Sequence, residues 1–155
     1  MKKIINQWLN TPGYNCFCCN PTNERGLHLE FYEDGDDVVT FWQPHKDFQS
    51  WVNVLHGGIQ AMLIDEVAGW VVTRKLQTTG VTSKMEMQYL QPVNINVEGL
   101  TIRAHIVKQM RNVVFIEGTI TDSNGTLCTK GTMTYFCASK QKATESGFVE
   151  CKVEE

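Results

Sequence analysis

The feature that most constrains this chain is a long, proline-free stretch of good helix formers, Gly57 to Gln77. When its residues are placed about 100° apart, Leu63 and Val67 lie on one side of the helix, and Ile64 and Ala68 lie on the opposite side. A helix that is apolar nearly all round must be surrounded by protein. A single curved sheet would cover only part of it, so we expect a second subunit to cover the rest.

Segments of alternating apolar and polar residues flank this helix and predict about six strands. Two precede the helix and four follow it: Gly26–Glu33, Asp37–Trp42, Val81–Gln91, Val97–Gln109, Val113–Asp122 and Thr126–Ala138. Short turns between consecutive strands favour an antiparallel meander, and a βαβ alternation is missing. The sequence therefore predicts an α+β fold in which a curved antiparallel sheet wraps around one long central helix.

The length of 155 residues predicts one domain. We expect this domain to span residues 1–138 and to begin with a short amphipathic helix, Met1–Asn10. Residues 139–155 are polar and show no period, so they are predicted to form a C-terminal tail. A hydrophobic content of 42% and a charged content of 20% are typical of globular proteins and exclude a disordered chain.

The charge pattern argues against nucleic acid and membranes as partners. The chain has 14 basic and 17 acidic residues and no block of lysines or arginines. No segment approaches the ~20 uninterrupted apolar residues of a membrane span, and no cleavage site follows the short apolar run at the start. We therefore expect a cytoplasmic protein whose six cysteines are reduced thiols.

Two carboxylates, Asp65 and Glu66, interrupt the apolar helix. Charged groups are rarely placed on buried helices without a partner or a purpose. Asp65 has Ala61 and Gly69 one turn away on either side, which leaves room for a ligand, and we predict that it acts as a general base. The alternative is that one or both carboxylates pair with a cation or cap a neighbouring backbone group.

The triplet His56-Gly57-Gly58 stands at the start of the same helix. Unpaired amides and the positive end of the helix dipole meet there, and glycines let a substrate approach those amides closely. A carbonyl oxygen that gains negative charge could be held at this position. The alternative is a glycine-rich turn in which the histidine only hydrogen-bonds the loop and holds the glycine amides in place.

The spacing between the two features has a structural consequence. Gly57 and Asp65 are eight residues apart, which corresponds to about 12 Å along a helix axis. One carbonyl group cannot touch both residues of the same chain. If both act on one substrate, the helix start of one chain must meet the helix middle of another, and we predict a two-fold dimer with two shared sites.

Three segments resemble one known family. Leu55-His56-Gly57-Gly58-Ile59-Gln60-Ala61-Met62-Leu63-Ile64-Asp65-Glu66 closely resembles the helix signature of hotdog-fold acyl-CoA thioesterases of the phenylacetate-pathway (PaaI-like) type. The segment from Cys16 to Phe31, which contains Cys16, Cys19, Asn20-Pro21 and Gly26-Leu27, is similar to the N-terminal motif of one branch of that family. Tyr89-Leu90-Gln91-Pro92 resembles the strand after the helix, and the resemblance covers about residues 14 to 138.

The resemblance implies a fold, a reaction and roles for individual residues. It implies the hotdog fold, dimers that often pair into tetramers as dimers of dimers, and hydrolysis of a thioester to a free acid and coenzyme A. By position, Asp65 matches the catalytic acid, Gly57 the oxyanion donor, and Thr82 the hydroxyl that helps to place the water or the acid, with Ser83 as a neighbouring substitute. Gln49 resembles a loop residue that faces the thioester.

The expected site therefore has two groups of residues. The predicted catalytic residues are His56, Gly57, Asp65 and Thr82. The predicted substrate-binding residues are Gln49, Gly58, Glu66, Ser83 and Arg111. Arg111 is included because the phosphates of coenzyme A need positive partners and this residue stands at a turn. The simpler interpretation is that Arg111 is only a solvated residue at the edge of the sheet. We expect no cofactor.

Two other functions stay open at this stage. A non-catalytic acyl-CoA sensor would use the same cleft, although no DNA-binding segment is visible. A hotdog dehydratase acting on 3-hydroxyacyl chains would pair a histidine with an acid across the dimer, and His56 is available for that role.

The cysteines allow one further interpretation. Cys16 and Cys19 have the spacing of half a zinc site or of a redox pair. The sequence contains no second matching pair, and the nearby His28 falls inside a predicted strand. We therefore predict no metal site, and the role of Cys16 and Cys19 stays open.

Overall fold

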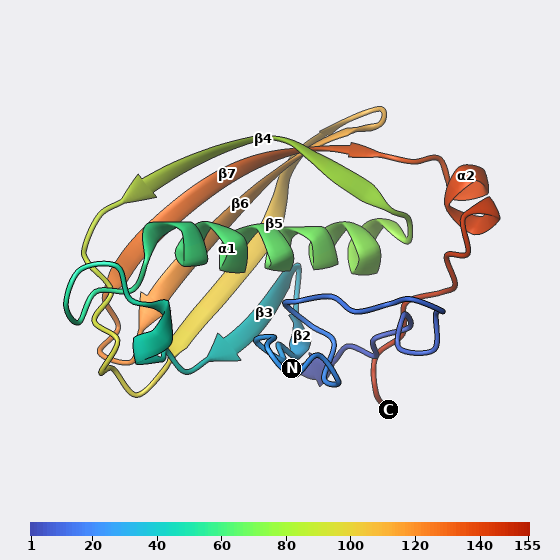
Figure 1. Ribbon diagram of the computed structural model, residues 1–155. Coiled ribbons are helices and arrows are strands. Elements are labelled where there is room, and N and C mark those ends of the chain that lie inside the picture. Colours follow the sequence, from blue (N-terminus) through green and yellow to red (C-terminus); the bar gives the residue numbers. More distant parts are fainter.

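A computed structural model describes residues 1–155 and shows one curved sheet packed against one long helix (Figure 1). The seven strands are β1 (Lys2–Lys3), β2 (Phe31–Asp34), β3 (Asp37–Trp42), β4 (Gly80–Tyr89), β5 (Leu100–Met110), β6 (Val113–Asp122) and β7 (Leu127–Cys137). The helical elements are η1 (Lys46–Phe48), α1 (Gly57–Val71), η2 (Val72–Leu76) and α2 (Lys140–Glu145). All strand pairs are antiparallel, and the predicted α+β class is confirmed.

The strand order is β1-β2-β3-β5-β6-β7-β4, which the predicted meander describes only in part. Strands β5, β6 and β7 follow one another through short turns, as expected. Strand β4 comes directly after the helix but pairs with β7 rather than with β5. The expectation of a full meander was wrong because the connection of residues 90–99, which contains Pro92, is no tight turn and carries the chain across the sheet.

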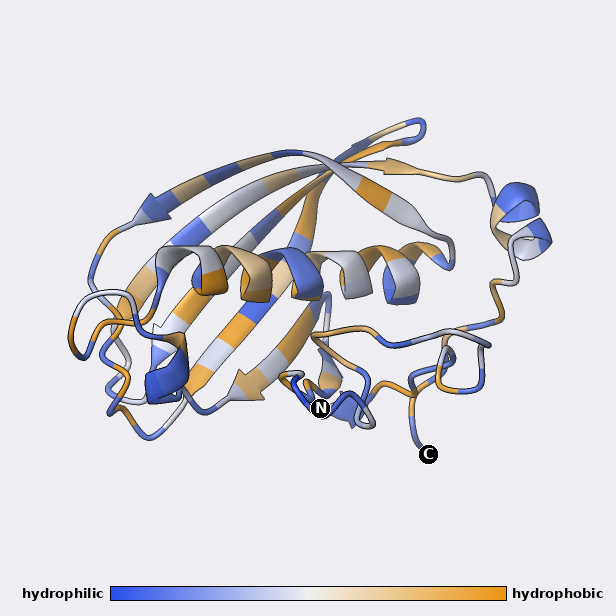
Figure 2. Ribbon diagram, in the orientation of Figure 1, coloured by the Kyte–Doolittle hydropathy of each residue, from blue (hydrophilic) through white to orange (hydrophobic).

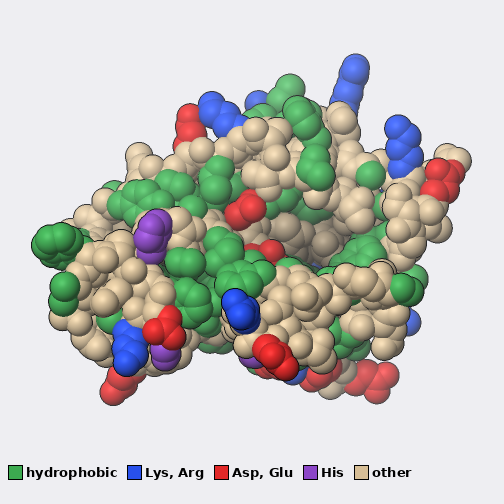
Figure 3. All heavy atoms as spheres, viewed as in Figure 1, with side chains coloured by type: hydrophobic (Ala, Val, Ile, Leu, Met, Phe, Trp, Pro, Cys, Tyr) green, Lys and Arg blue, Asp and Glu red, His purple; other side chains and the backbone are tan.

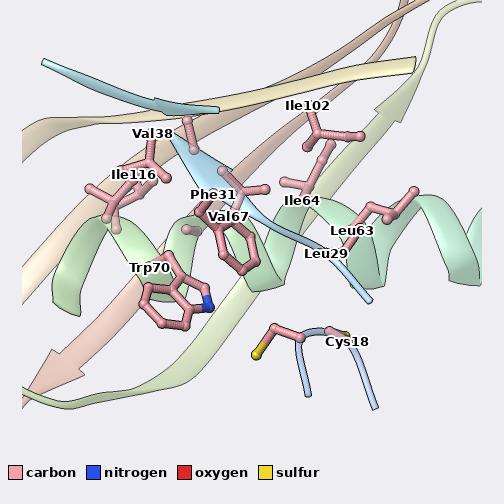
Figure 4. Packing of buried hydrophobic residues seen from close by; sticks show 14 of the residues in the cluster. Cys18, Leu29, Phe31, Val38, Leu63, Ile64, Val67, Trp70, Ile102 and Ile116 are labelled. Carbon is pink, nitrogen blue, oxygen red and sulfur yellow. The ribbon is translucent and has the colours of Figure 1, made fainter. Parts of the chain in front are cut away.

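Helix α1 lies close to the concave face of the sheet. Its side chains Ile64 and Val67 are fully buried and point toward Ile102 and Ile116 of the sheet (Figure 4). A side chain at Gly118 would place its Cβ 2.7 Å from the Ile64 Cγ2 atom. The absence of a side chain at this position lets the helix approach the strands at this distance.

The opposite face of α1 is partly covered by the chain's own N-terminal segment. Trp70 stacks on Phe31 with ring centroids 4.8 Å apart, Cys18 lies near Trp70, and Leu29 lies near Leu63 (Figure 4). Figure 2 shows hydrophobic residues, coloured orange, on α1 and on the strands that face it. The surface that we assigned to a second subunit is therefore shared with residues of the same chain.

No helix of the chain has the length and hydropathy that a membrane span requires.

The two ends of the chain lie together and differ from the sequence-based expectation. The predicted helix Met1–Asn10 was wrong: β1 pairs with β2, and Ile4 bridges to Val153. Residues 139–155, expected as a polar tail, contain α2, and the side chains of Phe148 and Cys151 are buried. The apolar residues of both ends cover each other, and neither segment alone shows this in its sequence pattern.

The first long strand is shorter than predicted because the chain before Phe31 pairs elsewhere. His28 has a φ of 54°, which an extended strand does not allow. The amides of Leu27 and Leu29 donate to the carbonyl oxygens of Phe17 and Cys18. The segment after Gly26 therefore holds the cysteine-containing loop in place.

Candidate active site

The carboxylate of Asp65 lies where α1 crosses β4 and β7. Its Oδ1 atom accepts hydrogen bonds from the Thr82 hydroxyl at 2.7 Å and from the Tyr135 hydroxyl at 2.6 Å. The Tyr135 hydroxyl also lies 2.7 Å from the Asp65 carbonyl oxygen. The structure thus brings together two predicted catalytic residues, Asp65 and Thr82, and adds a third residue.

Strand register explains why two hydroxyl groups converge on one carboxylate. Thr82 and Tyr135 are directly opposite each other in the β4–β7 pairing, so their side chains share the face that meets the helix. The pairing shifts between Thr82 and Lys84, which makes Ser83 the extra residue of a bulge. The Ser83 hydroxyl donates to the Thr134 carbonyl oxygen at 3.1 Å and not to Asp65.

Tyr135 was missed by the sequence analysis. Its side chain is only 3% exposed, and burial together with the nearby Asp65 charge raises the pKa of its hydroxyl above the usual value. The hydroxyl therefore stays protonated and donates to the carboxylate. The available signal was a tyrosine at an inward position of the last strand, because a buried hydroxyl needs a hydrogen-bond partner.

At the start of α1, the two predicted glycines have different environments. His56 is the N-cap residue, and its Nδ1 atom accepts the Gly58 amide at 2.8 Å. The Gly57 amide has no hydrogen-bond acceptor within the chain, so it is a free donor at the positive end of the helix. The Tyr89 hydroxyl donates to the Gly57 carbonyl oxygen at 2.8 Å and lies over this end of the helix.

The free amide and the carboxylate do not meet within one chain. Gly57 and Asp65 belong to the same continuous α-helix, and their separation along its axis is about 12 Å. Each chain therefore presents the amide and the carboxylate at two separate places on α1. Figure 3 shows acidic side chains at a hollow in the middle of this face, bordered by hydrophobic side chains.

Gln49 and Arg111, two other predicted residues, lie apart from the Asp65 carboxylate group. Gln49 is exposed, and its Oε1 atom accepts the Asn53 amide at 3.1 Å, which closes the loop before the helix. Arg111 stands in the β5–β6 turn with a φ of 55°. It borders a surface depression together with Lys75 and Lys140, near the C-terminal end of the helical stretch.

Glu66 faces away from Asp65 and toward the N-terminal segment. Its Oε1 atom accepts a hydrogen bond from Trp70 Nε1 at 3.2 Å and one from the Cys16 thiol at 3.7 Å. Burial, with a contribution from Cys16, raises the pKa of Glu66 to about 7. Asp65 and Glu66, although adjacent in sequence, therefore belong to two different clusters.

Comparisons with known proteins agree with this architecture. A hypothetical thioesterase from Streptococcus pneumoniae TIGR4 is 27% identical, with a TM-score of 0.66 over 72% of this chain and 90% of that one. The structure of that thioesterase with coenzyme A is also 27% identical, with a TM-score of 0.66 over 72% of this chain and 89% of that one. A Streptococcus mutans protein solved with acetyl-CoA is 20% identical over 72% of this chain and 90% of that one, and its TM-score of 0.65 shows the common fold.

No curated protein sequence matches this chain. The family model described as the thioesterase superfamily matches residues 52–129, which is just over half of the chain and includes α1, β4, β5 and β6. The fold and the family together support a thioesterase-type role. The expected hotdog fold is confirmed, and the chain belongs to the thioesterase superfamily.

Proposed function

We propose that this protein is an acyl-CoA thioesterase of the phenylacetate-pathway type that hydrolyses a thioester to a free carboxylic acid and coenzyme A. The observation that supports this most is the Asp65 carboxylate, which two hydroxyl donors hold in one orientation on a half-buried helix face. An oriented, half-buried carboxylate is suited to remove a proton from water. The free Gly57 amide is suited to bind a developing oxyanion.

The proposed reaction proceeds in two steps. Asp65 takes a proton from a water molecule while the water oxygen forms a bond to the thioester carbonyl carbon. The carbonyl oxygen becomes an oxyanion that accepts the Gly57 N–H. When this tetrahedral intermediate collapses, the carbon–sulfur bond breaks and the proton on Asp65 passes to the sulfur of the departing thiol. Thr82 and Tyr135 keep the carboxylate oriented throughout.

A dimer is part of this proposal, because each site needs Asp65 from one chain and Gly57 from another. Strand β4 ends the sheet, and Val81 and Tyr89 on it are 66% and 52% exposed. A long edge strand with exposed apolar residues is typical of a surface that pairs with another chain. We therefore propose a homodimer, with a tetramer as a dimer of such dimers.

Coenzyme A is the proposed thiol carrier because related structures bind it. The Streptococcus pneumoniae protein was solved with coenzyme A and the Streptococcus mutans protein with acetyl-CoA. Arg111 makes no ion pair in this chain, and we propose that it contacts a phosphate of the carrier. Six free cysteines support a cytoplasmic location.

Thiol release from a panel of short, medium, long and aromatic acyl-CoAs tests the proposed function. We expect release with at least one class, and the preferred class identifies the acyl pocket. Tight binding of acyl-CoAs without release of thiol from any of them would contradict the proposal and favour a sensor. The uncatalysed rate of each thioester under the same conditions is the control.

Thr82→Val is expected to lower kcat roughly tenfold and to leave KM nearly unchanged, since a hydrogen bond to a charged group is lost without a change in side-chain size. Steady-state thiol release measures both constants. Ser83→Ala is the matched control, because its hydroxyl bonds only to the Thr134 carbonyl oxygen. An equal loss in both variants would show that Thr82 has no special relation to Asp65.

A further inference from the structure

A second cluster of reactive side chains lies beside the proposed active site and takes no part in it. Cys16, Cys19 and Glu66 each place one possible ligand atom within 4.8 Å of the others. Two of these residues come from the loop before β2, and the third comes from the middle of α1. The fold thus brings together three metal-binding side chains that are distant in the sequence.

No cationic side chain lies near this cluster to neutralise its acidic groups. Glu66 makes no ion pair with any lysine, arginine or histidine of the chain. The pocket that the three side chains line has a volume of about 260 Å³, and none of its ten lining residues has a cationic side chain. Two thiols and a carboxylate in such a place need either their protons or a bound cation.

The separation of the ligand atoms suits zinc. In a tetrahedral zinc site, sulfur and oxygen ligands lie about 3.5 Å apart and two sulfurs about 3.8 Å apart, as follows from the usual bond lengths. The Cys16 Sγ atom lies 3.7 Å from the Glu66 Oε1 atom. All three ligand atoms lie within 4.8 Å of one another, which is about 1 Å beyond the spacing in a formed site.

Neighbouring groups hold two of these side chains in the required positions. The Tyr14 hydroxyl lies 2.9 Å from Cys19 Sγ, and Trp70 Nε1 donates to Glu66 at 3.2 Å. The Asn20 amide donates to the Cys16 carbonyl oxygen at 3.1 Å, which fixes the turn between the two cysteines. Partners of this kind orient the ligands of established metal sites.

We propose that Cys16, Cys19 and Glu66 bind one Zn²⁺ ion, whose fourth position opens to water in the adjoining cavity. The ion would connect the N-terminal loop to α1 next to the catalytic carboxylate. The sequence analysis predicted no metal because it sought a second cysteine pair. The third ligand is instead a helix carboxylate, which only the folded structure brings close.

Cobalt titration tests this site directly, because Co²⁺ occupies zinc sites and its thiolate complexes absorb light. The full-length protein is freed of metal with a chelator, kept reduced and titrated with Co²⁺ alone. We expect saturation at one ion per chain, a tetrahedral visible spectrum, a thiolate charge-transfer band, and displacement of cobalt by Zn²⁺. No saturable binding, or a spectrum without the thiolate band, would overturn the proposal.

Variants assign the ligands. Cys16→Ser and Cys19→Ser are each expected to lose about half of the charge-transfer intensity per bound ion and to weaken binding at least about tenfold. Glu66→Gln is expected to weaken binding to a similar degree, with the charge-transfer intensity of both thiolates retained. Because this variant keeps every thiol, it still tests the site if a cysteine variant misfolds. Cys137→Ser, outside the cluster, is the control. Unchanged binding in both single cysteine variants would exclude the site.

Discussion

Asp65→Asn is expected to lower kcat for thioester hydrolysis by at least about 100-fold while the protein remains folded. The amide has the size of the carboxylate, and its oxygen can still accept the hydrogen bonds from Thr82 and Tyr135. It cannot take a proton from water, so the general base is lost and the fold is not. Thiol release with the preferred acyl-CoA of the wild-type protein measures the effect, and circular dichroism checks the fold.

The matched control for this variant is Asp36→Asn. Asp36 lies exposed in the turn between β2 and β3. Its substitution also removes one negative charge, but at a position outside the candidate site. Its kcat and KM are expected to equal those of the wild type. Wild-type turnover by the Asp65→Asn protein would refute the role of Asp65 as the base.

Ile64→Ala is expected to reduce the free energy of unfolding by about 2–5 kcal/mol. Ile64 is fully buried where α1 packs on the sheet. Its Cγ2 atom lies 2.7 Å and 3.1 Å from the positions that a Cβ would take at Gly118 and Gly131. Neither glycine has a side chain that could fill the space left by Ile64, so truncation leaves a cavity in the closely packed core.

Urea denaturation at one fixed protein concentration measures this loss, because the stability of the proposed dimer would depend on concentration. Val107→Ala is the control, since Val107 on β5 is 50% exposed, and its change is expected to stay within about 0.5 kcal/mol. If Ile64→Ala lost less than about 1 kcal/mol, the close packing of helix on sheet would be incorrect.

Local patterns predicted the elements of this fold better than their partners. The helix from Gly57 was predicted to extend to Gln77, and the chain remains helical up to Leu76, with a wider π turn over the last residues. The β2–β3 hairpin and the three strands of the meander were also predicted. The pairing of β4 with β7 was not, because alternation shows which side chains are buried and not which strand lies alongside.

The positions of the candidate site residues were predictable where one segment contains the whole sequence motif. The helix signature indicated Asp65 and the free Gly57 amide, and the resemblance added Thr82. Tyr135 and the meeting of Cys16 with Glu66 depend on contacts between distant segments. No pattern within either segment shows such contacts, so they became visible only in the fold.

The central claim is that each site combines Asp65 of one chain with Gly57 of another, and subunit complementation tests it most directly. Gly57→Pro removes the amide donor. Proline suits the first helical position, and His56 before it has the extended conformation that proline requires (φ −56°, ψ 132°). A Cβ at this position would lie 3.3 Å from the ring of Tyr89, so this exposed side chain has to shift slightly. Asp65→Asn removes the base. Each variant alone is expected to be nearly inactive.

The measurement is thiol release by dimers formed from equal amounts of the two variants. Random pairing makes half of the dimers mixed, and each mixed dimer contains one intact site of two, so about a quarter of the wild-type activity should return. If both residues served the same site from one chain, no dimer would contain an intact site. Activity no higher than that of the separate variants would therefore contradict the shared site.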